Sequence, residues 1–270
     1  MPELPEVETV KNQLKKIILN KKIIKVEFLH EKIFNGAIKD IEEALINNEI
    51  IEIERYGKYL VFILKDKYNL ISHLRMEGKY HYRKDSSDIL KHEHVIFYFN
   101  DGSTLRYHDT RKFGRMDLRL KEEYLLVDPL HKLGKEPKDM LSGELYEILK
   151  NKNVLIKPAL LDQTVISGIG NIYADEVLFM SRVHPERNTQ TITKAEADLM
   201  TESAKIVFEK AIKLGGTTIK SFSATEIDGL FQNELLVHTK ENELCPVCSN
   251  IIIKTKVRGR GTYICEKCQK

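Results

Sequence analysis

The four cysteines of this 270-residue chain all lie among its last 26 residues and are spaced for metal binding. They form two Cys-x2-Cys pairs separated by 16 residues, namely Cys245, Cys248, Cys265 and Cys268. Such pairs direct four thiolates at one tetrahedral Zn²⁺, and the segment between them is long enough for a β-hairpin. Disulfides or unrelated thiols are the alternative, but a reducing cytoplasm disfavours disulfides, and every cysteine belongs to a matched pair. The spacing therefore predicts one structural zinc ion.

The N-terminal sequence offers a second kind of chemistry, because removal of the initiator methionine would make Pro2 the first residue. An α-amino group is partly unprotonated near neutral pH, so a terminal proline could attack an electrophilic carbon and form an iminium with a sugar aldehyde. The carboxylates of Glu3 and Glu6 follow closely and could donate a proton and orient the reacting groups. Alternatively, Pro2 is an ordinary second residue, and Glu6 is a favourable acid in the first turn of a helix.

Basic residues concentrate at the C-terminal end of a chain that is otherwise nearly balanced. The whole chain has 43 Lys and Arg, 40 Asp and Glu, and a formal net charge of +3. Residues 251–270 contain six Lys and Arg against the single acid Glu266. Such a local excess favours phosphate binding, whereas a solvated terminus without function is the alternative.

The composition is that of a globular protein with a sizeable core, at 42% hydrophobic and 31% charged residues. No apolar run approaches the roughly 20 residues that span a bilayer. The first ten residues carry acids where a secretory signal would carry lysines and an apolar stretch. We therefore expect a cytoplasmic protein without a membrane partner.

The elements that must position these residues follow from hydrophobic periodicity. Apolar residues recur at helical spacing over residues 6–19, which predicts an amphipathic helix. Alternating or β-rich runs at 24–28, 59–64, 69–74, 94–99 and 116–120 predict an antiparallel sandwich. The later pattern is helical, with a capping box formed by Thr193 and Glu196 and a stop at Gly215-Gly216. Residues 217–243 read as a loop before the zinc hairpin.

Six segments of the chain, taken in order, carry a family resemblance. They are MPELPEVETV at the start, RYGKYL at 55–60, DTRKFG at 109–114, SGIGNIYA at 167–174, GRGT at 259–262 and the four-cysteine finger. Together they closely resemble the bacterial formamidopyrimidine-DNA glycosylase family, over essentially all of residues 2–269. No single segment is specific for the family, but the order and the separations of all six together are specific for it.

The resemblance implies an α+β fold of three parts. Residues 1–130 would form a catalytic antiparallel β-sandwich with flanking helices. Residues 131–240 would form a helical DNA-binding domain with a helix–two-turns–helix element and a loop that caps the lesion. Residues 241–270 would form the zinc-finger β-hairpin. The family is expected to act as a monomer, with one structural Zn²⁺ and no organic cofactor.

The resemblance also implies a reaction, namely excision of oxidised purines (8-oxoguanine and formamidopyrimidines) from duplex DNA through a Schiff base on Pro2. Strand cutting at the abasic site by β,δ-elimination would follow. Glu3 would be the general acid that opens the sugar ring, with Glu6 in support. Lys58 would donate a proton in β-elimination, and Arg260 would serve δ-elimination and bind phosphate.

The binding residues are also implied by the resemblance. An enzyme that flips a base out of the duplex must fill the gap, and Met76, Arg111 and Phe113 match the family's wedge. Alternatively, Met76 and Phe113 are residues of the hydrophobic core. The further DNA contacts implied are His92, Lys152, Lys157 and Asn171, besides Arg111. Alternatively, Asn171 caps a helix. His92 could instead be a solvated surface residue, or it could form a metal-binding pair with His94, although the spacing of these two histidines is poor for a metal site.

The sequence is compatible with two rival functions. An endonuclease VIII type would use the same proline on oxidised pyrimidines, although Leu4 stands where that type usually has glycine. A non-catalytic binder of damaged DNA would keep the scaffold but form no covalent adduct. The chain also departs from the family pattern at Arg75, at Thr110 and at His238-Thr239. Arg75 and the capping loop leave the lesion spectrum open.

Overall fold

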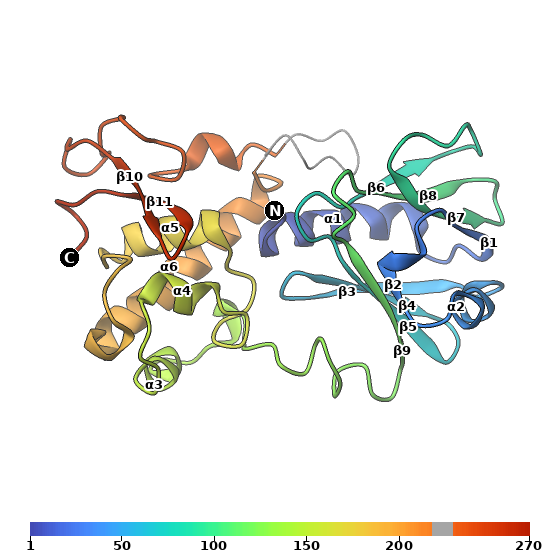
Figure 1. Cartoon of the computed structure of the whole chain (residues 1–270), viewed down its shortest axis with the longest axis horizontal. Helices are drawn as coiled ribbons and strands as arrows, with labels where there is room; N and C mark the ends of the chain where they lie inside the picture. Colours follow the sequence, from blue (N-terminus) through green and yellow to red (C-terminus); the bar gives the residue numbers. More distant parts are fainter. Residues whose placement is uncertain (218–228) are drawn as a thin grey trace. The chain divides into compact units, whose positions relative to one another are not determined.

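A computed structural model describes residues 1–217 and 229–270 of the chain (Figure 1). The chain divides into two compact units. The first contains Met1–His131 together with Thr217 and Gly229, and the second contains Lys132–Gly216 and Leu230–Lys270. Among the described residues, no helix has both the length and the apolar character needed to cross a membrane.

The first helix, α1 (Leu4–Ile18), confirms the helical period of the N-terminal sequence. Val7, Val10, Leu14 and Ile18 repeat every three or four residues and are almost fully buried. This face packs against β3 and β4 of the first unit. Because the helix is anchored along its length, the residues just before it are held in a fixed place.

The first unit contains two sheets, as the predicted sandwich requires. One has the order β1-β7-β8-β6, formed by Ile23–Phe28, Glu93–Phe99, Thr104–His108 and Lys79–Arg83. The other has the order β2-β9-β5-β4-β3, formed by Phe34–Asn35, Arg115–Leu120, Tyr68–His73, Tyr59–Leu64 and Ile50–Tyr56. Neighbouring strands are antiparallel except β2 and β9. One apolar core joins both sheets, α1 and the short helix α2 (Ile38–Leu45).

The second unit is helical and ends in the predicted hairpin. Its helices are α3 (Glu144–Leu149), α4 (Ile156–Leu161), α5 (Asn171–Met180) and α6 (Lys194–Lys213), and its hairpin is β10 (Ile253–Val257) and β11 (Arg260–Ile264). Thr193 and Glu196 form the predicted capping box of α6, and Gly215 and Gly216 follow its end. Short 3₁₀ helices occur in both units, at Glu31–Ile33, Pro137–Asp139, Thr189–Thr191 and Phe231–Glu234. Most of the predicted capping loop, residues 218–228, lies outside the described residues.

A buried ion pair connects strands of the four-stranded sheet. Arg106 is fully buried, and its guanidinium donates to the Glu93 carboxylate at 2.9 Å and to the carbonyl oxygens of Ser87 and Asp88. Arg83, which is partly exposed, binds the other oxygen of Glu93 at 2.9 Å. Arg106 therefore ties the segment before β7 to the sheet.

Replacing Arg106 by alanine should lower the free energy of unfolding by about 3–5 kcal/mol, because it leaves a buried carboxylate and two carbonyls short of a donor. Arg83→Ala removes the exposed partner of the same carboxylate and should cost at most about 1 kcal/mol. Urea denaturation of both variants measures the difference. An equal decrease in the free energy of unfolding in both variants would show that the buried arginine contributes no more to stability than the exposed one.

Candidate active site and nucleic-acid interface

The residues that begin the chain are buried at the start of α1. Pro2 is buried, and Glu3 is only 1% exposed. The backbone N–H of Glu3 donates to Oε2 of Glu6 at 2.9 Å. The other oxygen of Glu6 accepts the backbone N–H of Thr217 at 2.9 Å and its hydroxyl at 3.1 Å. Glu6 therefore fixes both the entry to α1 and the first residue of the segment predicted to cap the lesion.

Lys58 occupies the tight turn between β3 and β4 and is 5% exposed. Gly57 has a φ of 53°, a conformation that glycine adopts without strain. Arg55 donates to the carbonyl of Gly57 at 2.9 Å and pairs with Glu8 of α1 at 2.7 Å. The turn that carries Lys58 is thus tied to α1, the helix that directly follows Pro2 and Glu3.

His73, at the end of β5, is a buried histidine close enough to feel the charge of Lys58, and the sequence did not single it out. Its Nδ1 accepts the backbone N–H of Arg75 at 2.9 Å, and its ring packs edge-on against Tyr59. Burial, together with the charges of Arg75 and Lys58, lowers the pKa of His73 to about 3. At neutral pH the imidazole is therefore uncharged, with its proton on Nε2. A lone histidine at a strand end gives no sequence signal of this kind.

The predicted wedge residues come from two loops that the structure joins. Met76 follows β5, and Arg111 and Phe113 lie between β8 and β9. The carboxylate of Asp109, which is fully buried, accepts the backbone N–H groups of Arg111, Phe113 and Gly114 at 3.0, 2.9 and 2.8 Å. A hydrogen bond from Thr110 to Glu77 links the two loops.

Phe113 is not a core residue, because 47% of it is exposed. The guanidinium of Arg111 lies over its ring, 4.7 Å from the centroid. Met76 is partly buried. His92 joins this region through its carbonyl oxygen, which accepts the backbone N–H of Asp109 at 3.0 Å. The structure thus brings together Met76, His92, Arg111 and Phe113.

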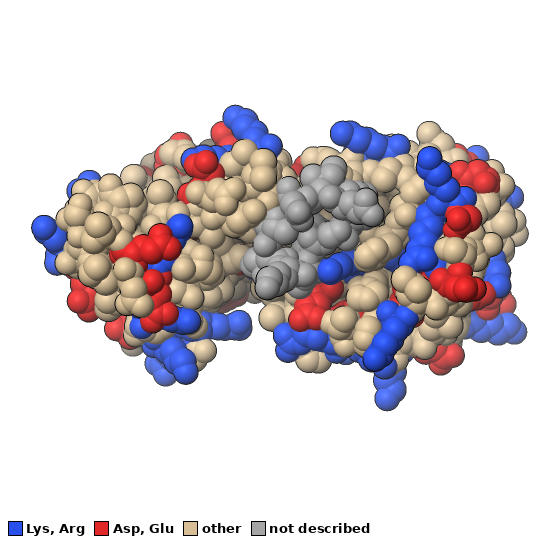
Figure 2. All heavy atoms as spheres, turned by 90° about the horizontal axis from the view of Figure 1, so that it is seen from above, with Lys and Arg blue, Asp and Glu red and all other residues tan. Residues whose placement is uncertain are grey.

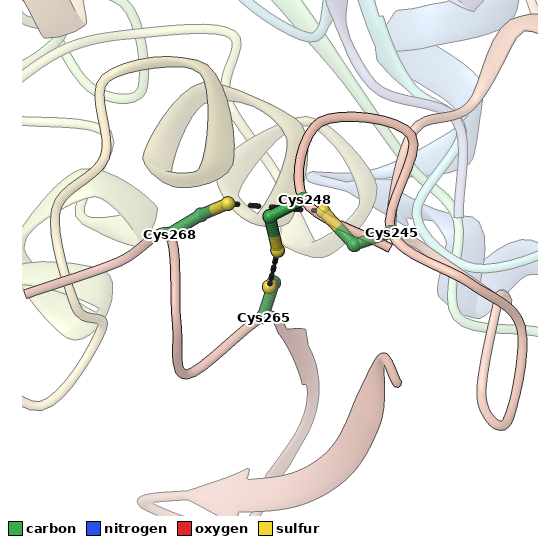
Figure 3. A group of neighbouring side chains, drawn as sticks. All are labelled: Cys245, Cys248, Cys265 and Cys268. Atoms are coloured by element: carbon green, nitrogen blue, oxygen red, sulfur yellow. Dashed lines mark hydrogen bonds between the residues drawn. The ribbon is translucent and has the colours of Figure 1, made fainter. Parts of the chain in front are cut away.

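The four cysteine sulfurs cluster at the base of the hairpin (Figure 3). All four lie within 4.8 Å of one another, with Sγ–Sγ distances of 3.8 Å for Cys245–Cys268 and 3.4 Å for Cys248–Cys265. Thiolates about 2.3 Å from a tetrahedral Zn²⁺ would lie about 3.8 Å apart, so the set fits zinc. A backbone hydrogen bond from Asn250 lowers the pKa of Cys248 to about 7, which favours its thiolate.

A buried polar network fixes the hairpin to α4 and α5 in the second unit. The ammonium of Lys157, which is fully buried, donates to Asp175 at 2.7 Å, to the carbonyl of Gly261 at 3.0 Å and to the hydroxyl of Thr262 at 2.8 Å. Asp175 also binds Nδ1 of His238 at 2.7 Å. Lys157 is predicted from sequence to contact DNA, but these buried partners favour a structural role.

The other predicted contacts of the second unit differ in exposure. Arg260 is exposed at the hairpin tip. Lys152 lies 3.4 Å from Asp162, and its side chain is 34% exposed. Asn171, the first residue of α5, donates to the carbonyl of Gly261 at 2.9 Å, and its buried Oδ1 has no partner among the described residues. In the face drawn in Figure 2, basic and acidic side chains are interspersed on each unit, in keeping with the small net charge.

The buried His73 predicts a pH dependence of stability. Its pKa is about 3 in the folded chain and near 6.5 when unfolded, so between these values the unfolded chain binds more protons. The contribution of His73 to the free energy of unfolding is therefore fully present above pH 6.5. Below that pH it falls by about 1.4 kcal/mol per pH unit. His73→Phe should reduce this slope between pH 6 and pH 4 in urea unfolding. His131→Gln, at an exposed histidine, is the control; equal slopes in wild type and His73→Phe would contradict the burial argument.

Loss of one cysteine should abolish zinc binding. Cys248→Ser should lower bound zinc from about one ion per chain to under about 0.1, because structural sites require all four ligands. Val247→Ser changes the exposed neighbouring residue and should keep the metal. Elemental analysis of the two purified proteins measures the difference. A full zinc ion in Cys248→Ser would show that the cluster is not the site.

Comparison with known proteins identifies the family. The family model for the formamidopyrimidine-DNA glycosylase N-terminal domain matches residues 1–116, that for its H2TH domain matches 133–223, and that for the zinc finger found in FPG and IleRS matches 242–270. The chain is 44% identical over 272 residues to formamidopyrimidine-DNA glycosylase of Mycoplasma mobile, covering 100% of this chain and 99% of that protein. It is 43% identical over 272 residues to the Ligilactobacillus salivarius protein of the same name, with the same coverage.

Solved structures give the same result. The Lactococcus lactis Fpg protein in complex with DNA containing N7-benzyl-Fapy-dG superposes with a TM-score of 0.94 at 40% identity, covering 100% of both chains. The same protein with abasic-site DNA gives a TM-score of 0.94 at 40% identity, covering 99% of both. The α+β fold and the four-cysteine zinc finger are thereby confirmed. This chain belongs to the formamidopyrimidine-DNA glycosylase family.

Proposed function

We propose that this chain is a DNA repair glycosylase and abasic-site lyase that removes oxidised purines, such as 8-oxoguanine and formamidopyrimidines, from duplex DNA in base excision repair. Its relatives carry the glycosylase name over their whole length, and related solved structures contain DNA with Fapy-dG or an abasic site. The observation that carries the proposal is the start of α1, where Pro2 and Glu3 are buried and Glu6 accepts the backbone N–H of Glu3.

In the proposed first step, the nitrogen of Pro2, freed by removal of Met1, attacks C1′ of the damaged nucleotide. The bond from C1′ to the base breaks, and the base leaves with the electron pair and takes up a proton. Glu3 donates a proton to the sugar ring oxygen, which opens the ring and gives the iminium. Glu6 acts as a positioning residue, since its carboxylate holds the N–H of Glu3.

The proposed strand cleavage uses the iminium as an electron sink. Loss of a C2′ proton breaks the C3′–oxygen bond, and a second elimination breaks the C5′–oxygen bond. Lys58 donates a proton in the first elimination, and Arg260 assists the second by binding phosphate. Water then hydrolyses the imine and frees Pro2. The Zn²⁺ held by the four cysteines would stabilise the hairpin that carries Arg260.

Recognition of the lesion would use the loops described above. Met76, Arg111 and Phe113 would enter the space left by the flipped base, and the Arg111 guanidinium can bond the orphaned base. Support comes from Asp109, which holds the loop in place through three backbone N–H groups while Phe113 stays exposed. His92, Lys152 and Asn171 would contact the DNA backbone, and Lys157 would position the hairpin beside Asn171.

The proposal includes the arrangement of the whole protein. The catalytic sandwich would occupy residues 1–130, the helical DNA-binding domain 131–240 and the zinc finger 241–270. The protein would act as a monomer on double-stranded DNA in the cytoplasm.

Pro2→Gly should reduce excision of 8-oxoguanine opposite cytosine by at least about 100-fold, because the buried secondary amine is the proposed nucleophile. Its affinity for a duplex with a tetrahydrofuran abasic analogue should stay within about threefold of wild type. Single-turnover excision and equilibrium binding measure the two effects separately. Wild-type excision by Pro2→Gly would exclude Pro2 as the nucleophile, and activity of the wild type on oxidised pyrimidines alone would favour the endonuclease VIII type.

A further inference from the structure

Two histidines of the four-stranded sheet are neighbours on the face that is turned away from the apolar core. The antiparallel register of β6 with β8 makes His81 and His108 diagonal neighbours on one side of the sheet. Tyr80 and Tyr107, the residues next to them in the chain, are fully buried in the core on the other side. The two imidazole ring centres lie 5.5 Å apart.

Each of these imidazoles has one buried nitrogen that lacks a partner. Nε2 of His81 and Nδ1 of His108 are both hidden from solvent, and neither forms a hydrogen bond with any residue in the described part of the chain. Buried polar atoms in native proteins almost always have a partner, so an orphaned one indicates a bound water or ion. Here two orphaned nitrogens belong to adjacent rings, which points to one shared occupant.

Both imidazoles are in the form that binds a metal ion. Burial lowers the pKa of His81 to about 4, and it also lowers the pKa of His108. At neutral pH both rings are therefore uncharged, and each keeps one nitrogen with a lone pair. A neutral imidazole is the most common metal ligand among side chains, and it needs no proton to be removed before the ion binds.

The spacing of the two rings fits a single ion between them. Imidazoles that bind one tetrahedral ion at about 2.0–2.1 Å have ring centres about 5 Å apart, close to the observed 5.5 Å. The ring of His92 lies 5.8 Å from that of His108. Among the residues that the structure describes, however, only the four cysteines bring three or more potential ligand atoms together. An ion at His81 and His108 would thus have two protein ligands and complete its coordination with water.

The charges around the two rings indicate which class of ion would bind. The carboxylate of Glu93 acts on both imidazoles in the direction that favours a cation, and the ammonium of Lys79 acts on both in the opposite direction. Glu93 is also shared with Arg83 and Arg106. The site therefore offers nitrogen ligands without an excess of negative charge. Such a site suits a transition metal, whereas Ca²⁺ and Mg²⁺ require oxygen ligands.

We propose that His81 and His108 together bind one divalent transition metal ion, such as Ni²⁺, Cu²⁺ or Zn²⁺, at a site separate from the four cysteines. The ion would cross-link β6 and β8 directly before Asp109, whose carboxylate holds the loop of Arg111 and Phe113. Because the ion binds the folded sheet and not the unfolded chain, it should raise the thermal stability of the protein.

The test is calorimetric titration of the full-length, zinc-loaded protein with Ni²⁺, in a buffer that does not bind metals and without a polyhistidine tag. One Ni²⁺ per chain should bind with a micromolar Kd while the zinc content stays unchanged. His81→Gln and His108→Asn each remove one ligand and should weaken binding by at least about tenfold. His131→Gln, which changes an exposed histidine, is the matched control and should bind Ni²⁺ as the wild type does.

A measurement on the wild type makes the test independent of whether the variants fold. Ni²⁺ is paramagnetic and broadens the NMR signals of nearby nuclei, so ¹⁵N-labelled histidines report which of the nine imidazoles is close to it. The ring signals of His81 and His108 should broaden first. Broadening of other histidines instead, or full affinity in both variants, would overturn the proposal. So would Ni²⁺ uptake only as zinc is released, and absence of binding at millimolar Ni²⁺ would mean that water satisfies the two nitrogens.

Discussion

The carboxylate of Glu6 is the interaction on which the candidate active site depends. One oxygen accepts the N–H of Glu3, and the other accepts two donors of Thr217. A buried carboxylate that lost these donors would be costly, so the chain cannot leave this arrangement easily. Because the apolar face of α1 is packed into the core, the position of Glu6 is itself fixed. The backbone of Glu3, at the start of α1, is thereby held in place.

Two other buried carboxylates also accept several backbone N–H groups. Asp109 accepts three backbone N–H groups and shapes the loop of Arg111 and Phe113. Glu176 of α5 accepts the backbone N–H groups of Leu236, Val237 and His238 at 2.8, 3.0 and 2.9 Å, just before the zinc finger. Burial raises the pKa of Glu176, and the three amide donors oppose that rise. In each case a buried acid fixes an irregular segment of backbone.

Part of this structure could be predicted from the sequence, where the signal is local. The cysteine spacing gave the metal cluster, the apolar period gave α1, and Thr193 with Glu196 gave the start of α6. Strands β6 and β8 were not predicted, because His81 and Arg106 interrupt their apolar pattern where the chain pairs them across the sheet. The burial of Lys157 was not predictable either, since its partner Asp175 lies 18 residues away and the hairpin 104 or more.

The most direct test of the account is borohydride trapping on a duplex that carries 8-oxoguanine opposite cytosine, followed by mass spectrometry of the trapped peptide. The expected product is a reduced adduct on the nitrogen of Pro2, in a chain that has lost Met1. An adduct on a lysine, or none from a folded, zinc-loaded protein with free Pro2, would contradict it. If no adduct forms and the protein still binds abasic DNA tightly, the chain is a non-catalytic binder of damaged DNA.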